Sequence, residues 1–389
     1  MSPRTRVVVA SLVSAAALAC AGGAVASGCA EDEHKRSDGG DVTGGCSIKA
    51  GEIPPPSCDN ASNECATERA CSIDEKKCGS ASTCLPIADN KGKQVLDFRM
   101  RRLNVAAPKA LAQQFIQKTV VTTNIDLNAR ECGEKGKGLF TWLLRVDRQN
   151  NTLVTGGAPP SADPFGVGYC FARFTTADKI VIEPLQTGIV FQGDTFKSTD
   201  KKKLNVPIFL NGDVNNVVVL PVTDVVIQGV ALSEGGNCIG KLNPNALSSD
   251  CSDDPALCSK WQTAGALGGY ITIEEADQVY IQDLSESLCV ILTQSSKGPD
   301  GRCTRQNGKI AFEGDYCSKD KQPGSCKDSF WLAATFAASA VTIYDGNGKL
   351  PTCSGQSAVV DGGSDGASDA TTDAPADATA DAPSDATAD

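Results

Sequence analysis

The chain has 389 residues, with 18 Cys, a single His and a formal net charge of −11. The one His, His34, lies close to the N-terminus, so the residues after it cannot form a Ser-His-Asp or Cys-His hydrolase site. Catalytic zinc held by His and iron held by two His and a carboxylate are excluded for the same reason.

The negative charge is concentrated in the C-terminal tail. Residues 361–389 contain eight Asp and no base, whereas the first 28 residues contain two Arg and no acid. Without these two segments 34 bases and 39 acids remain, a net charge of −5. This is an ordinary soluble surface, and it predicts no nucleic-acid partner.

The N-terminus has the layout of a secretory signal peptide. Arg4 and Arg6 precede an apolar run from Val7 to Val25. The run is just long enough to span a bilayer, but its second half is made of small residues suited to cleavage. We therefore predict a signal peptide over residues 1–28.

The leader ends in the residues Ala26-Ser27-Gly28-Cys29, which resemble the lipobox of bacterial lipoproteins. In that family the Cys becomes the lipid-modified first residue. The resemblance implies lipidation of Cys29 and attachment to the bilayer of the cell envelope, at the outer membrane or cell surface. Two alternatives stay open: a poorer match ends at Cys20, and Ala24-Val25-Ala26 suits secretion without lipid.

Export predicts that the remaining Cys form disulfides. Removal of Cys20 and Cys29 leaves sixteen, an even number, in an oxidising compartment. No Cys-x-x-Cys pair is present to favour zinc. We predict up to eight disulfides, no metal and no cofactor.

Composition divides the mature chain into four parts. Residues 29–45 are a flexible tether, 46–88 a Cys-rich module, 89–356 a β-rich body and 357–389 a disordered acidic tail. The module is too small for a core of its own, and three bridges among its six Cys would stabilise it. Residues 63–78 could form a helix that ends at Gly79.

The body is predicted to be mainly β, a disulfide-stabilised β-sandwich or jelly-roll-like fold with one or two short helices. Short β-rich runs separated by Asn, Asp, Gly and Pro carry this prediction. They lie at 180–183, 189–192, 206–210, 217–222, 225–232, 270–273, 279–282, 288–292 and 331–344.

Three local features of the body are also predicted. A hairpin is predicted over residues 140–146 and 152–155. A helix is predicted to begin at Pro108, with an apolar stripe of Leu111, Phe115 and Ile116. Proximity along the chain pairs Cys289 with Cys303 and Cys317 with Cys326.

The best candidate for a ligand-binding side chain is Trp261. The two other Trp, Trp142 and Trp331, sit in strongly apolar strands and are predicted to be core. Trp261 follows a polar stretch, so we expect it at the surface, where its ring could stack on a sugar.

Other patterns that resemble catalytic or metal-binding motifs are interpreted as structural. Glu274, Glu275, Asp277 and Asp283 could act as paired carboxylates on a glycoside, but they also fit a solvated strand face. Ser198 and Lys201 match only a Ser-x-x-Lys fragment. Turns at Asn211 and Asp345 could offer oxygens to calcium, but neither has a full EF-hand loop.

These observations favour a non-enzymatic envelope protein that binds a carbohydrate or another envelope component. The alternatives are a carboxylate-based hydrolase that acts on glycans and a purely structural surface protein. No catalytic residue is assigned.

The lipid anchor is directly testable. Metabolic labelling with a fatty acid should mark the wild-type protein, and Cys29→Ser should abolish the label because the modified thiol is lost. Label that persists in Cys29→Ser would show that Cys29 is not the anchor.

Overall fold

The computed structural model describes residues 48–58, 84, 86–113, 117, 121, 123–125, 140–209, 217–242 and 261–344, apart from 162, 165, 178 and 296. All of them belong to one compact unit, residues 44–389. The predicted signal peptide, tether up to residue 45, acidic tail and helix at 63–78 lie outside the described residues, as do the turns at Asn211 and Asp345.

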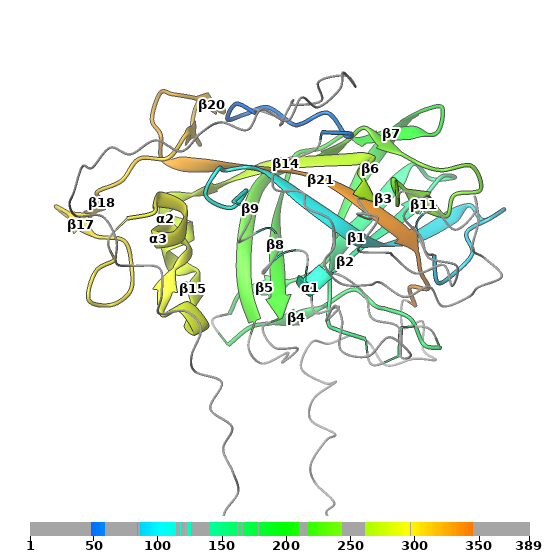
Figure 1. Ribbon diagram of the computed structural model, residues 1–389, viewed down its shortest axis with the longest axis horizontal. Coiled ribbons are helices and arrows are strands. Elements are labelled where there is room, and N and C mark those ends of the chain that lie inside the picture. The colour runs from blue at the N-terminus through cyan, green and yellow to red at the C-terminus, as the bar shows by residue number, and fades with distance from the viewer. Residues whose placement is uncertain are drawn as a thin grey trace, which may run out of the picture. The chain divides into compact units, whose positions relative to one another are not determined.

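The described part of the chain is mainly β, as predicted. Its principal feature is a thirteen-stranded sheet in which the hydrogen-bonded order is β10-β7-β6-β3-β2-β1-β21-β14-β9-β8 (Figure 1). Strand β11 pairs with β21, and β19 pairs with both β20 and β21. All pairings between these named strands are antiparallel.

The strands of this sheet are short apart from three of twelve or thirteen residues. Their bounds are β1 Val95–Ala107, β2 Thr141–Asp147, β3 Thr152–Ala158, β6 Leu185–Gln192, β7 Thr195–Ser198, β8 Lys202–Phe209, β9 Val217–Gln228, β10 Val230–Ala231, β11 Cys238–Ile239, β14 Gly265–Thr272, β19 Tyr316–Cys317, β20 Gln322–Pro323 and β21 Ser329–Ala340.

Smaller elements complete the described part. The two-stranded ladders are β4 Phe174–Thr175 with β5 Val181–Ile182, β12 Lys241–Leu242 with β13 Trp261–Gln262, β15 Tyr280–Ile281 with β16 Glu286–Ser287, and β17 Arg305–Gln306 with β18 Lys309–Ile310. The helices are α1 Thr123–Ile125, α2 Ile273–Gln278, α3 Leu288–Thr293 and the 3-10 helix η8 Gln282–Leu284.

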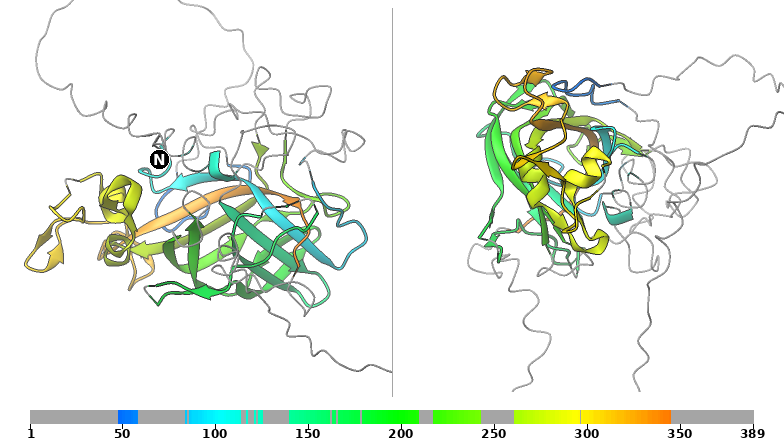
Figure 2. Two further views of the ribbon diagram at one scale, coloured as in Figure 1. Left: turned by 90° about the horizontal axis from the view of Figure 1, so that it is seen from below. Right: turned by 90° about the vertical axis from the view of Figure 1, so that its left-hand side faces the viewer.

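The two arms of the sheet curl until they face each other. Strand β8 packs on β3 so closely that a Cβ on Gly157 would lie 2.5 Å from Cγ of Pro207. Strand β7 reaches β9, where the Ser198 hydroxyl accepts the Ile227 N–H at 3.1 Å. The two layers of the predicted sandwich therefore come from one curled sheet (Figure 2).

The curl encloses the main hydrophobic core, and α2 and α3 lie at one end of it (Figure 2, right). Inward residues of β1 and β2 pack there against residues of β9, α2 and α3. Core members from the strands include Phe98, Met100, Leu144, Phe196, Ile227 and Phe336, and those from the helices include Ile273, Val290 and Leu292.

The central strand pair, β1 with β21, is buried on both faces. All twelve residues of β21 are buried. The pair places Arg99 of β1 opposite Ser339 of β21. The Arg99 guanidinium donates to the Met100 and Ile125 carbonyls at 3.1 and 2.8 Å and lies 5.7 Å from the Tyr169 ring centroid.

Strand β1 was not among the predicted strands. Its charged run, Arg99 to Arg102, breaks the expected alternation of apolar and polar residues. The structure buries these Arg side chains instead of exposing them: the Arg99 guanidinium donates to the Ile125 carbonyl, and that of Arg101 lies 5.7 Å from the Trp261 ring centroid.

One predicted strand is wrong. The run Leu288–Leu292, expected as a strand, lies in helix α3, because a short apolar run fits either a buried strand or a buried helix. The helix expected from Pro108 is described only in part: the Ala112 N–H donates to the Pro108 carbonyl at 3.1 Å and the Gln117 N–H to the Gln113 carbonyl at 2.9 Å, whereas Phe115 and Ile116 lie outside the described residues.

The predicted hairpin and both predicted local disulfides are confirmed. Strands β2 and β3 pair from Thr141 with Ala158 to Asp147 with Thr152. Cys289 bonds to Cys303, and Cys317 bonds to Cys326.

The expectation that the six Cys of the 46–88 module pair among themselves is wrong. Cys84 bonds to Cys238, 154 residues away. The Cys84 carbonyl also accepts the Ser339 hydroxyl of β21. This bridge covalently attaches the module to the body.

The contact between the arms can be tested at Gly157. Gly157→Ala should lower the free energy of unfolding by about 1–3 kcal/mol, because the new methyl group overpacks against Pro207. Urea unfolding under oxidising conditions measures this. Gly298→Ala is a control, since its Cβ would meet the flexible Asp300 carboxylate at 3.1 Å and the Arg302 carbonyl at 3.4 Å, with no approach as close as that to Pro207. Equal effects of the two substitutions would contradict close packing of the arms.

Candidate functional site

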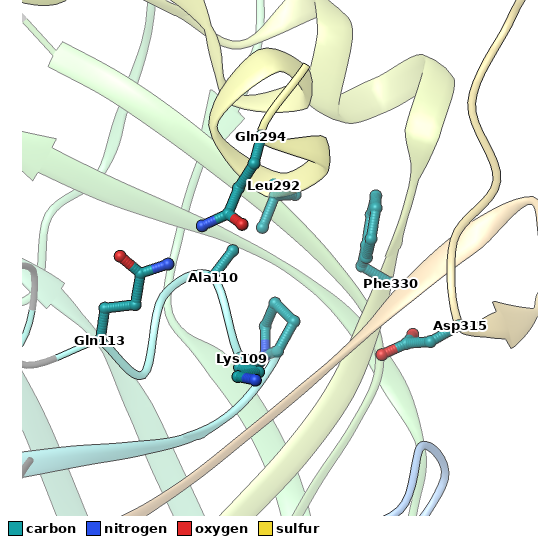
Figure 3. A pocket seen from close by; sticks show the side chains of 8 residues that line it. Lys109, Ala110, Gln113, Leu292, Gln294, Asp315 and Phe330 are labelled. Carbon is teal, nitrogen blue, oxygen red and sulfur yellow. The ribbon is translucent and has the colours of Figure 1, made fainter. Parts of the chain in front are cut away.

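A pocket of about 280 Å³ opens beside α3, where the end of β1 meets the start of β21. Its walls come from four separate segments of the chain: residues 108–113, the end of α3, Asp315 before β19, and Phe330 in β21 (Figure 3). The lining residues are Pro108, Lys109, Ala110, Gln113, Leu292, Gln294, Asp315 and Phe330.

The pocket has an amide side and a side formed by an aromatic ring and a carboxylate. Gln113 and Gln294 lie on one side of Ala110 and Leu292, and Phe330 and Asp315 lie on the other (Figure 3). Phe330 and Leu292 belong to the main core and are 7% and 5% exposed, so the apolar wall is anchored. Polar groups on an apolar, fixed wall are typical of ligand sites.

Local sequence explains how these side chains are placed. Strand β1 ends at Ala107, and the following Pro cannot donate to a ladder. Helix α3 stops at Gln294, whose φ of 52° lies in the left-handed region used at helix C-termini. Both segments therefore turn at the pocket and expose polar side chains there.

Asp315 is the one acidic residue in the lining. Its Oδ1 accepts the Trp331 backbone N–H at 2.8 Å, which orients the carboxylate. The residue is open to solvent on one side, but partial burial against the pocket wall raises the pKa of its carboxyl above the ordinary value. Lys109 is the one base in the lining, so the pocket carries no net charge when both are ionised.

The two confirmed local disulfides adjoin the pocket. Cys289 precedes Gln294 on α3 and bonds to Cys303, while Cys317 follows Asp315 on β19 and bonds to Cys326. Two walls of the site are thus cross-linked close to their polar residues.

The acidic cluster predicted on strands lies instead on helix α2. Thr272 and Glu275 form a capping box that begins the helix, a signal present in the sequence as Thr-Ile-Glu-Glu. Asp283 lies in η8. The assignment of these acids to a strand face is therefore wrong.

The acids on α2 form ion pairs and hydrogen bonds with neighbouring residues of the fold. Arg305 pairs with Glu274 at 2.8 Å and with Asp277 at 2.9 Å. Asp277 is buried and also accepts the Ser287 hydroxyl and the Cys303 N–H, both at 2.8 Å. Asp277 thus links α2 to the Cys289–Cys303 bridge.

Glu275 is paired with Lys203 at 2.7 Å. Burial acts to raise the pKa of Glu275, but hydrogen bonds from Lys203 and Thr272 outweigh it and lower the pKa below the ordinary value. A general acid for glycoside cleavage needs the opposite shift.

Trp261 does not lie at the surface. It is 4% exposed, packs with the Cys84–Cys238 bridge and has the Arg101 guanidinium 5.7 Å from its ring centroid. Its predicted exposure is wrong, because residues distant in sequence cover it, and glycan binding through this ring stays a prediction. Trp142 and Trp331 are core residues, as predicted.

The Ser198 fragment has a structural explanation. Ser198 ends β7, and its hydroxyl accepts the Ile227 N–H across the curl. Lys201 is exposed. No contact between them supports the Ser-x-x-Lys reading.

Comparison with known proteins gives no relative. No protein-family model, no curated protein and no solved structure matches the chain. The site must therefore be interpreted from its own chemistry.

Sequence reasoning did not select the residues of this pocket. Asp315, Gln113, Gln294 and Phe330 belong to no motif, and three of them are distant in sequence from Gln113. The only signal was indirect: the predicted bridges at Cys289 and Cys317 lie next to Gln294 and Asp315.

The protonation of Asp315 can be tested by stability. Because its pKa is higher in the folded than in the unfolded chain, its contribution to stability is present below the unfolded pKa and lost as pH rises through the folded pKa. Asp315→Asn does not titrate and can still accept the Trp331 N–H. The free energy of unfolding of the variant, compared with that of wild type, should therefore rise as the pH increases from 3 to 7.

Urea unfolding at a series of pH values measures this gain. Glu234→Gln, in an exposed turn, is the control and should show a smaller trend. A difference for Asp315→Asn that is flat or falls with pH would contradict the assignment.

Proposed function

We propose that the protein is an exported envelope lipoprotein that binds a small polar ligand without transforming it. The lipobox-like residues before Cys29 and the predominance of paired Cys support export and anchoring. The pocket at Asp315 supports ligand binding, and it is the observation that carries the proposal.

The lining supports binding over hydrolysis. Carboxylate-based cleavage of a glycoside needs two facing acids, one of which protonates the leaving group. The lining contains Asp315 alone, and the acids of α2 are engaged by Arg305 and Lys203. The hydrolase alternative therefore has less support.

The proposed attachment is a lipid on Cys29. Among the described residues no helix is both long enough and apolar enough to span a membrane. In the proposed arrangement the tether of residues 29–45 separates the lipid from the body, whose pocket faces the surroundings of the envelope.

Filling the pocket tests the binding function. Ala110→Phe should remove ligand-induced stabilisation, because Ala110 lies between the two sides of the pocket (Figure 3). We would measure thermal unfolding of wild type and variant with a panel of sugars, amino acids and dipeptides. At least one class should raise the midpoint of wild type only.

The matched control is Ala311→Phe, since Ala311 is exposed and outside the pocket. It should respond like wild type. Stabilisation that survives Ala110→Phe, the absence of any response in wild type, or turnover of a compound in the panel would contradict the proposal.

A further inference from the structure

We propose that the pocket binds one neutral sugar unit, such as the terminal residue of a glycan. This inference rests on the proposed function, because it names the ligand class of the same pocket. It is carried by two primary amides on one side of the pocket and an aromatic ring with one carboxylate on the other (Figure 3).

The polar groups match neighbouring hydroxyls. Each Gln side chain offers a donor and an acceptor, and the Asp315 carboxylate offers two acceptor oxygens. Because Oδ1 of Asp315 is already engaged by the Trp331 N–H, Oδ2 is the oxygen available to a ligand. Hydroxyl groups both donate and accept, so a sugar can pair with all three side chains.

The apolar surface matches the other face of a sugar ring. Phe330 is held in the core and presents its ring to the pocket, opposite the amides of Gln113 and Gln294. An aromatic ring provides a rigid apolar surface on which the C–H groups of a pyranose can pack. The volume of about 280 Å³ lies just below the usual range for drug-sized ligands, so the pocket has room for one ring rather than an extended chain.

The charges of the lining residues favour a neutral sugar over an acidic one. Asp315 and Lys109 cancel in the lining, and no second base is present there to hold a phosphate or a carboxylate. A uronic acid would place its carboxylate in the same small pocket as Asp315, and like charges in a partly desolvated site repel. A nucleotide would lack partners for its phosphates.

The test uses the full exported protein in isothermal titration calorimetry and saturation-transfer NMR. The ligands are glucose, galactose, N-acetylglucosamine and glucuronic acid. We expect at least one neutral sugar to bind and glucuronic acid to bind more weakly at pH 7.

Three substitutions identify the contacts. Asp315→Asn should weaken binding about ten-fold through loss of a charge-assisted hydrogen bond. Gln294→Asn should weaken it about five-fold, because Asn tolerates the left-handed backbone of this position but is shorter. Phe330→Leu should reduce transfer to the ring protons of the sugar.

Gln306→Ala and Glu234→Gln, both exposed and outside the pocket, are controls and should bind like wild type. Circular dichroism and thermal unfolding confirm that each variant folds. Sugar binding that is equal in the pocket variants and the controls would overturn the inference.

The outcomes separate this inference from the proposed function. If amino acids or dipeptides stabilise wild type but not Ala110→Phe, and no sugar binds, the ligand class is wrong and the binding function stands. If glucuronic acid binds more tightly than every neutral sugar, the charge argument is overturned. If nothing binds the pocket, both proposals fail.

Discussion

The pairing of β1 with β21 is the constraint on which the rest of the structure depends. It joins residues 95–107 to residues 329–340, so the described body closes on itself from opposite ends of the sequence. One face of the pair belongs to the main core, and the other is covered by the segment around Cys58 and Cys84. A strand buried on both faces has no water to satisfy its polar groups, so each needs a partner within the protein.

Hydroxyl groups provide many of these partners on the outer face. Thr335 donates to the Cys58 carbonyl at 3.2 Å, and Ser339 donates to the Cys84 carbonyl. The Thr263 hydroxyl donates to the Pro56 carbonyl at 2.8 Å and lies 3.0 Å from the Thr335 hydroxyl. These bonds attach residues 56, 58 and 84 to the buried sheet.

The same strand pair creates the candidate site. Because β1 ends at Ala107 where β21 begins, Pro108 and Phe330 meet although more than two hundred residues separate them. Helices α2 and α3 lie at this end of the core, and the Asp277 network fixes α2 to the Cys289–Cys303 bridge. The pocket is therefore lined by core residues and by two segments that disulfides cross-link. Such fixed walls preorganise a site for a small ligand.

How well the sequence predicted each element follows from how local its causes are. The β2–β3 hairpin and the short-range bridges at Cys289 and Cys317 depend on neighbours in the chain, and the sequence predicted them. Strand β1 was missed, because its Arg99 is buried against the distant Ile125 carbonyl and Tyr169 ring, which no local pattern indicates. The Leu288 run was misread, because an apolar pentamer has no period that distinguishes strand from helix. Trp261 was placed at the surface, because its cover comes from Cys84 and β1.

The sequence by itself therefore determined the β class of the body, its nearest disulfides and the absence of a His after residue 34 that could serve as a base. These properties depend on residue types and short spacings. Only the tertiary structure decided that Cys84 bonds to Cys238, that the α2 acids are held in ion pairs, and that Asp315 and Phe330 line one side of a pocket whose other side carries two amides. Such contacts depend on the curl and register of a sheet, which bring together side chains that no spacing in the sequence relates.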